Sequence, residues 1–102
     1  MTDIELLELA AKAAGYTINF NDYMVSSAEI DYWIEDSGEG RYWNPLTDDG
    51  DALRLAVKLG IDPMFNKPCV YAAGFWENMD ADPTAATRRA IVRAAAEIGK
   101  AA

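Results

Sequence analysis

The chain of 102 residues is 51% hydrophobic and 25% charged, which is the balance of a single globular domain over residues 1–102. Its 9 basic and 17 acidic residues give a net charge of −8, which argues against nucleic acid or an anionic membrane as a direct partner, because both attract clustered cations. Histidine is absent and Cys69 is the one cysteine. This excludes His-assisted nucleophiles, an internal disulfide and a cysteine-rich metal cluster within these residues.

The charge is distributed unevenly along the chain. Residues 1–51 hold 2 basic and 12 acidic residues, a net charge of −10, whereas residues 52–102 hold 7 basic and 5 acidic residues, a net charge of +2. The first half therefore produces almost all of the negative field, and it predicts a surface that attracts a cationic partner.

The first half predicts one helix followed by a strand hairpin. Thr2 and Glu5 form a capping box before a helix over 3–14, with apolar residues at helical spacing. Alternating residues predict a strand over 16–20, a turn at 21–22 and a second strand over 28–34. In that second strand, one face carries Ile30, Tyr32 and Ile34, and Trp33 lies on the opposite face. A turn over 37–40 and a short returning strand over 41–43 complete the hairpin.

The second half predicts two helices around one strand. Acidic residues open a helix that ends at Gly60, and its apolar residues cover more than one side, so we expect it to be deeply packed. We expect a loop over 62–68. In the stretch 69–76, the odd and the even positions are both apolar, so a strand there would have two apolar faces. Such a strand must be covered on both faces. Asp82 and Pro83 then begin a helix over 83–98.

This order of elements predicts an α+β domain. Short connections favour a small, mostly antiparallel sheet of three or four strands. The strand over 69–76, which is apolar on both faces, predicts helices packed on both faces of that sheet, an α/β/α sandwich. The alternative places all three helices on one face of the sheet.

Three blocks of the sequence resemble small tailed-phage proteins of the phage ABA-sandwich type. They are residues 5–16, residues 42–56 (which begin Tyr-Trp-Asn-Pro-Leu-Thr) and residues 82–99, in the same order and over about half of the chain. The resemblance implies a helix–sheet–helix sandwich and a bacteriophage or prophage accessory protein that acts in the host bacterial cytoplasm. It implies no activity and supplies no catalytic residues.

Acidic and aromatic residues alternate in the segment between the first two blocks and just beyond it. Such a surface suits docking on a basic groove, because charge steers the encounter and the rings supply affinity. An ordinary solubilising acidic edge explains the same pattern. The candidate partner-binding residues are Asp22, Tyr23, Glu29, Asp31, Trp33, Glu35, Asp36, Glu39 and Tyr42.

Two further clusters have competing interpretations. The alternative ligand-binding residues lie on the last helix and are suited to phosphate: Arg88, Arg89 and Arg93. Such a row of arginines is usually a solvated face, and some of its members pair with acidic residues. The acids over 48–51 lack the alternating ligands and distal Glu of a calcium loop, so we interpret them as helix caps and predict no metal site. Trp43 is interpreted as a structural plug where the hairpin meets the second helix.

The preferred hypothesis is a non-enzymatic accessory protein that binds and occludes a host protein with a basic surface, as a counter-defence or host-takeover inhibitor. The first alternative is a protein that binds or sequesters a nucleotide-like signal with the arginine helix and an aromatic residue. The second is an enzyme that uses carboxylates alone. We predict no cofactor and no membrane or nucleic-acid partner, and we leave a homo-oligomer open.

Overall fold

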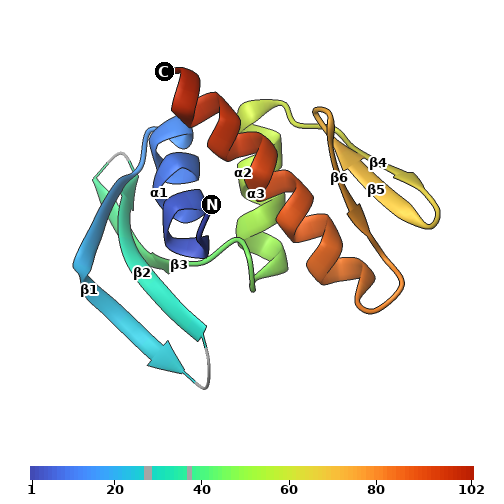
Figure 1. Ribbon diagram of the computed structural model, residues 1–102. Coiled ribbons are helices and arrows are strands. Elements are labelled where there is room, and N and C mark those ends of the chain that lie inside the picture. Colours follow the sequence, from blue (N-terminus) through green and yellow to red (C-terminus); the bar gives the residue numbers. More distant parts are fainter. Residues whose placement is uncertain (27–28, 37) are drawn as a thin grey trace.

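The computed structural model describes residues 1–26, 29–36 and 38–102, with the side chains of 19–31 outside that description. Within these described residues the structure has three helices and six strands (Figure 1). In chain order they are α1 (Asp3–Ala14), β1 (Thr17–Ser26), β2 (Glu29–Asp36), β3 (Glu39–Trp43), α2 (Asp49–Leu59), β4 (Pro63–Asn66), β5 (Cys69–Ala72), β6 (Phe75–Asn78) and α3 (Pro83–Ala101).

The strands form two antiparallel sheets, with orders β1-β2-β3 and β4-β5-β6. Figure 1 shows the three helices between them, with α1 beside the first sheet and α3 beside the second. The predicted α+β class, the antiparallel pairing and the packing of helices on sheets are confirmed. The layering differs from the predicted one, because the helices form the middle layer and the strands are divided between two outer sheets.

The division into two sheets follows from a tight turn inside the stretch 69–76. Ala73 and Gly74 have φ of 48° and 89° and connect β5 to β6 as a two-residue hairpin. Positive φ at both central residues is the signature of the type I′ turn, whose twist matches that of paired strands. The segment therefore folds back on itself, and the prediction of one long strand was wrong. The predicted loop over 62–68 also contains a strand, β4, which begins at Pro63 on a sheet edge, where a missing donor is tolerated.

The first sheet matches its predicted faces where side chains are described. Tyr32 and Ile34 are buried and Trp33 points the other way, as the alternation predicted. The turn predicted at 21–22 is absent, since β1 continues to Ser26 through a shift of register between Asn19 and Tyr23. Such a β-bulge accommodates extra residues without ending the strand pairing.

Each helix begins with a side-chain cap, as the sequence predicted. The Thr2 hydroxyl accepts a hydrogen bond from the amide of Glu5 at 3.2 Å. Asp48 accepts from the amide of Asp51 at 2.8 Å, and Asp82 accepts from that of Ala85 at 3.1 Å. No helix in the described ranges is both long enough and apolar enough to cross a membrane.

Small residues allow α1 and α3 to approach closely. A Cβ added at Gly99 would overlap the carbonyl oxygen of Leu9, so the two backbones are nearly in contact there. α3 is covered on several sides, because it contacts α1, α2 and the second sheet. The buried alanines of these two helices are Ala10, Ala11 and Ala14 on α1 and Ala86, Ala90, Ala94, Ala95 and Ala96 on α3.

α2 is less buried than its composition predicted. Leu55 and Ala56 are in the core, whereas Leu53 and Val57 are 63% and 75% exposed. The prediction of a deeply packed helix was wrong, because only one face of α2 meets the rest of the helical layer. Its outward face leaves two large apolar side chains in solvent.

We expect Gly99→Ala to lower the free energy of unfolding by about 1–3 kcal/mol, because the new methyl group would force α1 and α3 apart. Gly50→Ala is the matched control: it lies in α2, and the nearest atoms to its Cβ would be the side-chain ends of Arg54 and Asp48, at 3.1–3.3 Å, with no backbone atom among them. Denaturant unfolding measures both variants. Equal stability of the Gly99 variant and the parent chain would contradict close helix contact at Gly99.

The cap of α3 predicts a dependence of stability on pH. The Ala85 amide and the Thr84 hydroxyl lower the pKa of Asp82 below its ordinary value of 3.8. A folded-state pKa below the unfolded one stabilises the native state at higher pH, and this stabilisation is lost as the pH falls through the folded value. We therefore expect Asp82→Ala to lower the melting temperature at neutral pH and to differ less from the parent in strong acid. Asp80→Ala is the control, because Asp80 is also exposed. A difference in melting temperature between Asp82→Ala and the parent that stays constant with pH would contradict the lowered pKa of Asp82.

Candidate functional site

An aromatic pair lies on the outer face of the first sheet. Trp33 on β2 is paired in register with Tyr42 on β3, so the two side chains share one face. Their ring centroids are 5.1 Å apart at an interplanar angle of 82°, a favourable edge-to-face arrangement. Tyr42 is 39% exposed and Trp33 is partly exposed. Both rings therefore remain available to a partner on the side of the sheet that faces away from the helices (Figure 1).

Gly40 makes room for this arrangement. A Cβ at Gly40 would overlap the Trp33 indole, so the ring lies across the bare backbone of β3. Contact with a glycine backbone on one side and Tyr42 on another holds the indole flat against the sheet. The predicted turn over 37–40 includes Gly40, which instead lies in β3, and no periodic pattern marks its role.

The acids of the candidate site divide between the two faces of the sheet. Glu35 is exposed and lies on the same face as Trp33, two residues farther along β2. Asp36 is on the opposite face, where it forms ion pairs with Arg41 at 3.9 Å and Lys58 at 3.4 Å. Glu39 is paired in register with Asp36 and is exposed at the end of the sheet. We call the surface made by Trp33, Glu35 and Tyr42 the Trp33 face.

Four candidate residues fall outside the described side chains. Asp22 and Tyr23 lie on β1, and Glu29 and Asp31 lie on β2. Their backbones belong to the same sheet, with Tyr23 paired to Tyr32 and Asp31 to Met24. Their contribution to a binding surface stays a prediction.

A cationic and aromatic cluster, which sequence analysis missed, fixes the inner side of the same sheet. The Tyr16 ring has the Arg41 guanidinium 5.4 Å and the Lys58 ammonium 4.8 Å from its centroid. Tyr16 also packs edge-on against Trp43, which is 1% exposed. Asp36, bonded to both cations, completes the cluster and links β2, β3 and α2. The burial of Trp43 confirms its predicted role as a plug.

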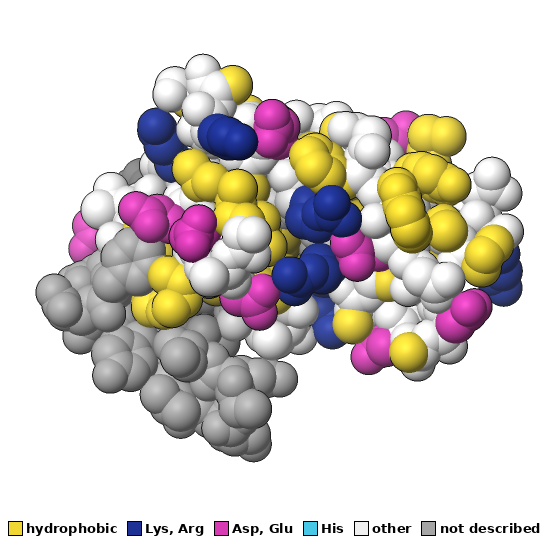
Figure 2. Space-filling model, viewed as in Figure 1, with side chains coloured by type: hydrophobic (Ala, Val, Ile, Leu, Met, Phe, Trp, Pro, Cys, Tyr) yellow, Lys and Arg dark blue, Asp and Glu magenta, His cyan; other side chains and the backbone are white. Residues whose placement is uncertain are grey.

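The three arginines of α3 are not gathered into one site. Arg88 donates to Asp49 at 2.6 Å and to the carbonyl oxygen of Leu46 at 2.8 Å, and it thereby joins α3 to the start of α2. Arg89 donates to Asp3 at 3.1 Å, at the start of α1. These two contacts confirm that arginines of the second half pair with acids of the first. Figure 2 shows basic side chains along the middle of the molecule beside acidic ones.

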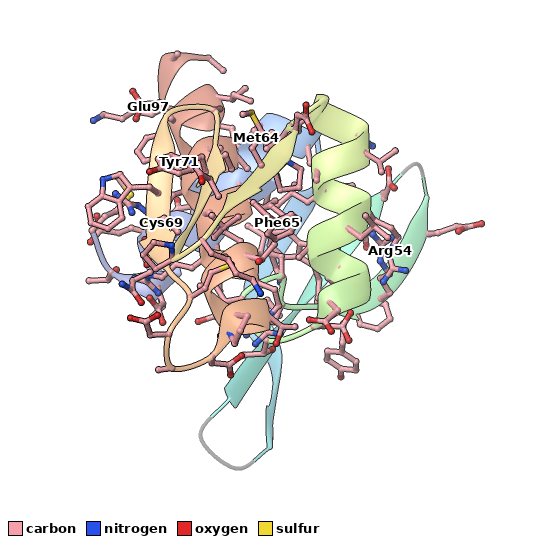
Figure 3. All side chains as sticks on the ribbon, turned by 90° about the vertical axis from the view of Figure 1, so that its right-hand side faces the viewer. Arg54, Met64, Phe65, Cys69, Tyr71 and Glu97 are labelled. Atoms are coloured by element: carbon pink, nitrogen blue, oxygen red, sulfur yellow. The ribbon has the colours of Figure 1, made fainter. Side chains whose placement is uncertain are left out.

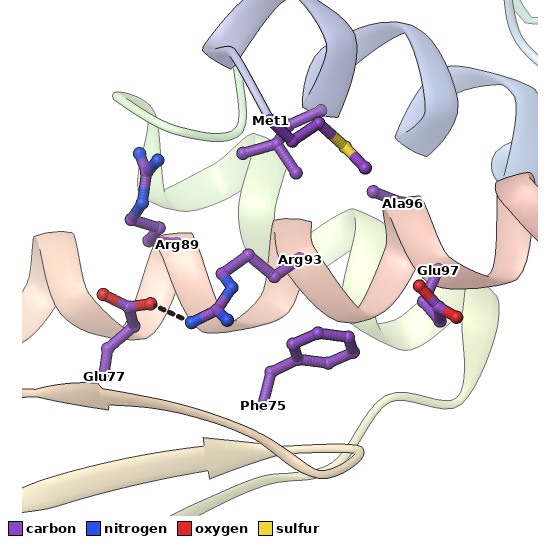
Figure 4. Close-up of a pocket in the computed structure, with 8 residues that line it drawn as sticks. Met1, Phe75, Glu77, Arg89, Arg93, Ala96 and Glu97 are labelled. Atoms are coloured by element: carbon purple, nitrogen blue, oxygen red, sulfur yellow. Dashed lines mark hydrogen bonds and ion pairs between the residues drawn. The ribbon is translucent and has the colours of Figure 1, made fainter.

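Arg93 belongs to a small pocket between α1, α3 and β6. Its guanidinium forms an ion pair with Glu77 and lies 5.0 Å from the centroid of the Phe75 ring (Figure 4). The pocket has a volume of about 370 Å³ and is also lined by Arg89 and Glu97. Its two arginines are both engaged by carboxylates, so a phosphate would have to displace an ion pair to bind. Arg88 faces a different hollow.

That second hollow is a groove of about 520 Å³ between α2, α3 and β4. Leu53, Phe65 and Ile91 give it an apolar lining, and Lys67 and Arg88 lie among its polar residues. Phe65 is 63% exposed and lies on β4, an edge strand of the second sheet. Figure 3 shows Phe65 between the second sheet and α2.

The acids over 48–51 act in helix capping and in a buried link. Asp51 is 6% exposed and accepts hydrogen bonds from the amide of Asn44 at 3.0 Å and from Arg54 at 2.8 Å. This hydrogen bond raises the pKa of Arg54 above its ordinary value. With Asp48 as the helix cap, the capping interpretation is confirmed. Within the described part of the chain, no group of three or more acidic or sulfur side chains is arranged to hold a metal ion.

We expect Gly40→Ala to push the Trp33 indole off the sheet and into solvent, because the new methyl group would occupy its place. The measurement is acrylamide quenching of tryptophan fluorescence in a Trp76→Phe background, which removes the 57% exposed tryptophan. Quenching should rise in the Gly40 variant and stay unchanged in the Gly50→Ala control. Unchanged quenching in both would contradict the contact between Trp33 and Gly40.

Comparison with known proteins gives no relative: no family model, no curated protein and no solved structure matches this chain.

Proposed function

We propose that this chain is a non-enzymatic protein-binding domain that uses the Trp33 face to occlude a host protein with a basic surface. The observation that carries the proposal is the exposed Trp33–Tyr42 pair with Glu35 beside it, on the open face of a sheet. Aromatic side chains dominate the affinity of protein interfaces, and a nearby carboxylate favours a cationic partner.

The charges of the described residues support this choice of surface. Several acidic residues of the first half form ion pairs within the chain, including Asp3, Asp36 and Asp49. Glu35 forms no ion pair among the described residues, so its charge remains available to a partner on the Trp33 face. Glu39 also forms none there, but it lies at the end of the sheet, in register with Asp36. A field of this kind speeds the encounter with a basic groove and weakens as salt is added.

The biological setting is proposed from the three sequence blocks described above. Their resemblance to small tailed-phage proteins supports a phage or prophage accessory protein that acts in the host bacterial cytoplasm, against a defence or nucleic-acid-handling factor. The arginine helix favours this proposal over phosphate capture, because its three guanidinium groups already have carboxylate partners.

The test is capture from bacterial lysate, with and without phage infection, by the immobilised parent chain and by three variants. We expect Trp33→Ala to weaken binding of the captured protein by tenfold or more, since loss of a central aromatic costs about 2 kcal/mol or more. Glu35→Lys should slow association and remove much of the salt dependence.

Glu8→Lys is the matched control, because it makes the same change of charge at an exposed position of α1, away from the Trp33 face. It should bind as the parent does. A captured protein that binds all three variants with the parent's affinity would overturn the proposed surface, and turnover of a substrate by the purified chain would overturn the binding-only function.

A further inference from the structure

The outer face of the second sheet carries no charge, and one of its two cross-strand rows is apolar. In the register of β4, β5 and β6, Met64, Tyr71 and Trp76 form one cross-strand row, and Asn66, Cys69 and Asn78 form the next. Directly paired residues point to the same side, so these six side chains share one face. We call it the β4–β6 face. Figure 3 shows Met64 and Tyr71 side by side on it, turned toward the viewer.

The helices cover only the inner face of this sheet. Val70 and Ala72 are fully buried against the helical layer. On the outer face, Met64 is 61%, Tyr71 38% and Trp76 57% exposed, and Figure 2 shows hydrophobic side chains gathered over β4–β6. A strand that is apolar on both sides normally has both sides covered. Contiguous exposed apolar surface of this kind marks an interaction site.

We propose that the β4–β6 face is a self-association surface on which a second copy of this chain packs face to face. The absence of charge makes this face compatible with a second copy. Each copy carries a net charge of −8, so two copies repel each other across most of their surfaces. The β4–β6 face is uncharged, and two copies can meet there without bringing like charges together. A basic host protein is instead attracted to the Trp33 face, on the other side of the helical layer (Figure 1).

The face is also self-complementary. Two sheets pack about 10 Å apart with their strands nearly aligned. A twofold axis parallel to β5, the central strand, places β4 of one copy over β6 of the other. Met64 of each copy then lies over Trp76 of the second copy, and the two Tyr71 rings meet at the axis. Thioether–aromatic and aromatic–aromatic contacts are both favourable. The same axis sets the two Cys69 side chains opposite each other.

The first experiment is sedimentation velocity over a concentration series up to millimolar protein. A face of six residues per copy predicts a weak dimer whose population rises with concentration. Trp76→Glu should leave a monomer at every concentration, because it buries a charge at the interface and pairs it with no cation. Leu53→Glu is the matched control, since Leu53 is 63% exposed, close to the 57% of Trp76, but lies on α2, and it should dimerise as the parent does.

The second experiment tests the arrangement of the two copies. We expect Met64→Lys alone to be monomeric, and a mixture of Met64→Lys with Trp76→Glu to form a heterodimer, because the two new charges face each other across the axis. A short bis-maleimide should link two parent copies through Cys69, and Cys69→Ser should abolish the link. A parent chain that is monomeric throughout overturns the proposal, as does loss of the dimer in the Leu53 control alone. Failure of the mixed variants to associate overturns the twofold arrangement.

This inference is independent of the proposed function. Trp33→Ala leaves the β4–β6 face intact and should not change self-association, so either proposal can fail without the other.

Discussion

The close contact between α1 and α3 determines the architecture of this chain. Gly99 allows the backbones to meet at Leu9, and alanines fill the rest of the helical layer. Short side chains give a thin middle layer, and α3 in it contacts two helices and a sheet at once. Such a layer has two broad sides, and each side needs an apolar cover. One three-stranded sheet supplies each cover, so the molecule presents the back of a sheet at both ends (Figure 1).

The backs of the two sheets differ because different residues occupy their outward positions. In β2 and β3 the outward positions bring Trp33 and Tyr42 together beside Glu35. In β4, β5 and β6 they bring apolar and amide side chains together without any charge. Between the sheets, the arginines of α3 neutralise acids at the starts of α1 and α2 and on β6. Two of these ion pairs join α3 to α1 and α2 within the helical layer, and the third joins α3 to the second sheet.

Local patterns predicted the helices well, and the sheets less well. Caps at Thr2, Asp48 and Asp82 mark helix starts because each acts within three residues. The pairing of 69–76 with itself depends on positive φ at Ala73, which alanine rarely adopts and which alternation of apolar residues does not reveal. The acids of the candidate site show the same limit: the spacing of Glu35 and Asp36 predicts opposite faces, yet only the fold shows that Lys58 of α2 reaches Asp36. Contacts between distant segments decide which charges remain free.

The apolar character of 69–76 has a consequence that a single helical layer does not satisfy. Of the two strands in this stretch, only β5 is apolar on both faces, and α3 covers one of these faces. The outer face of the sheet has no such cover, because Met64, Tyr71 and Trp76 remain exposed in the folded chain. On a strongly acidic molecule, an uncharged face of this kind is where contact between identical copies costs least electrostatically. Self-association there would leave both Trp33 faces of a dimer outward, and two linked binding faces hold a partner with two basic sites more tightly than one face does.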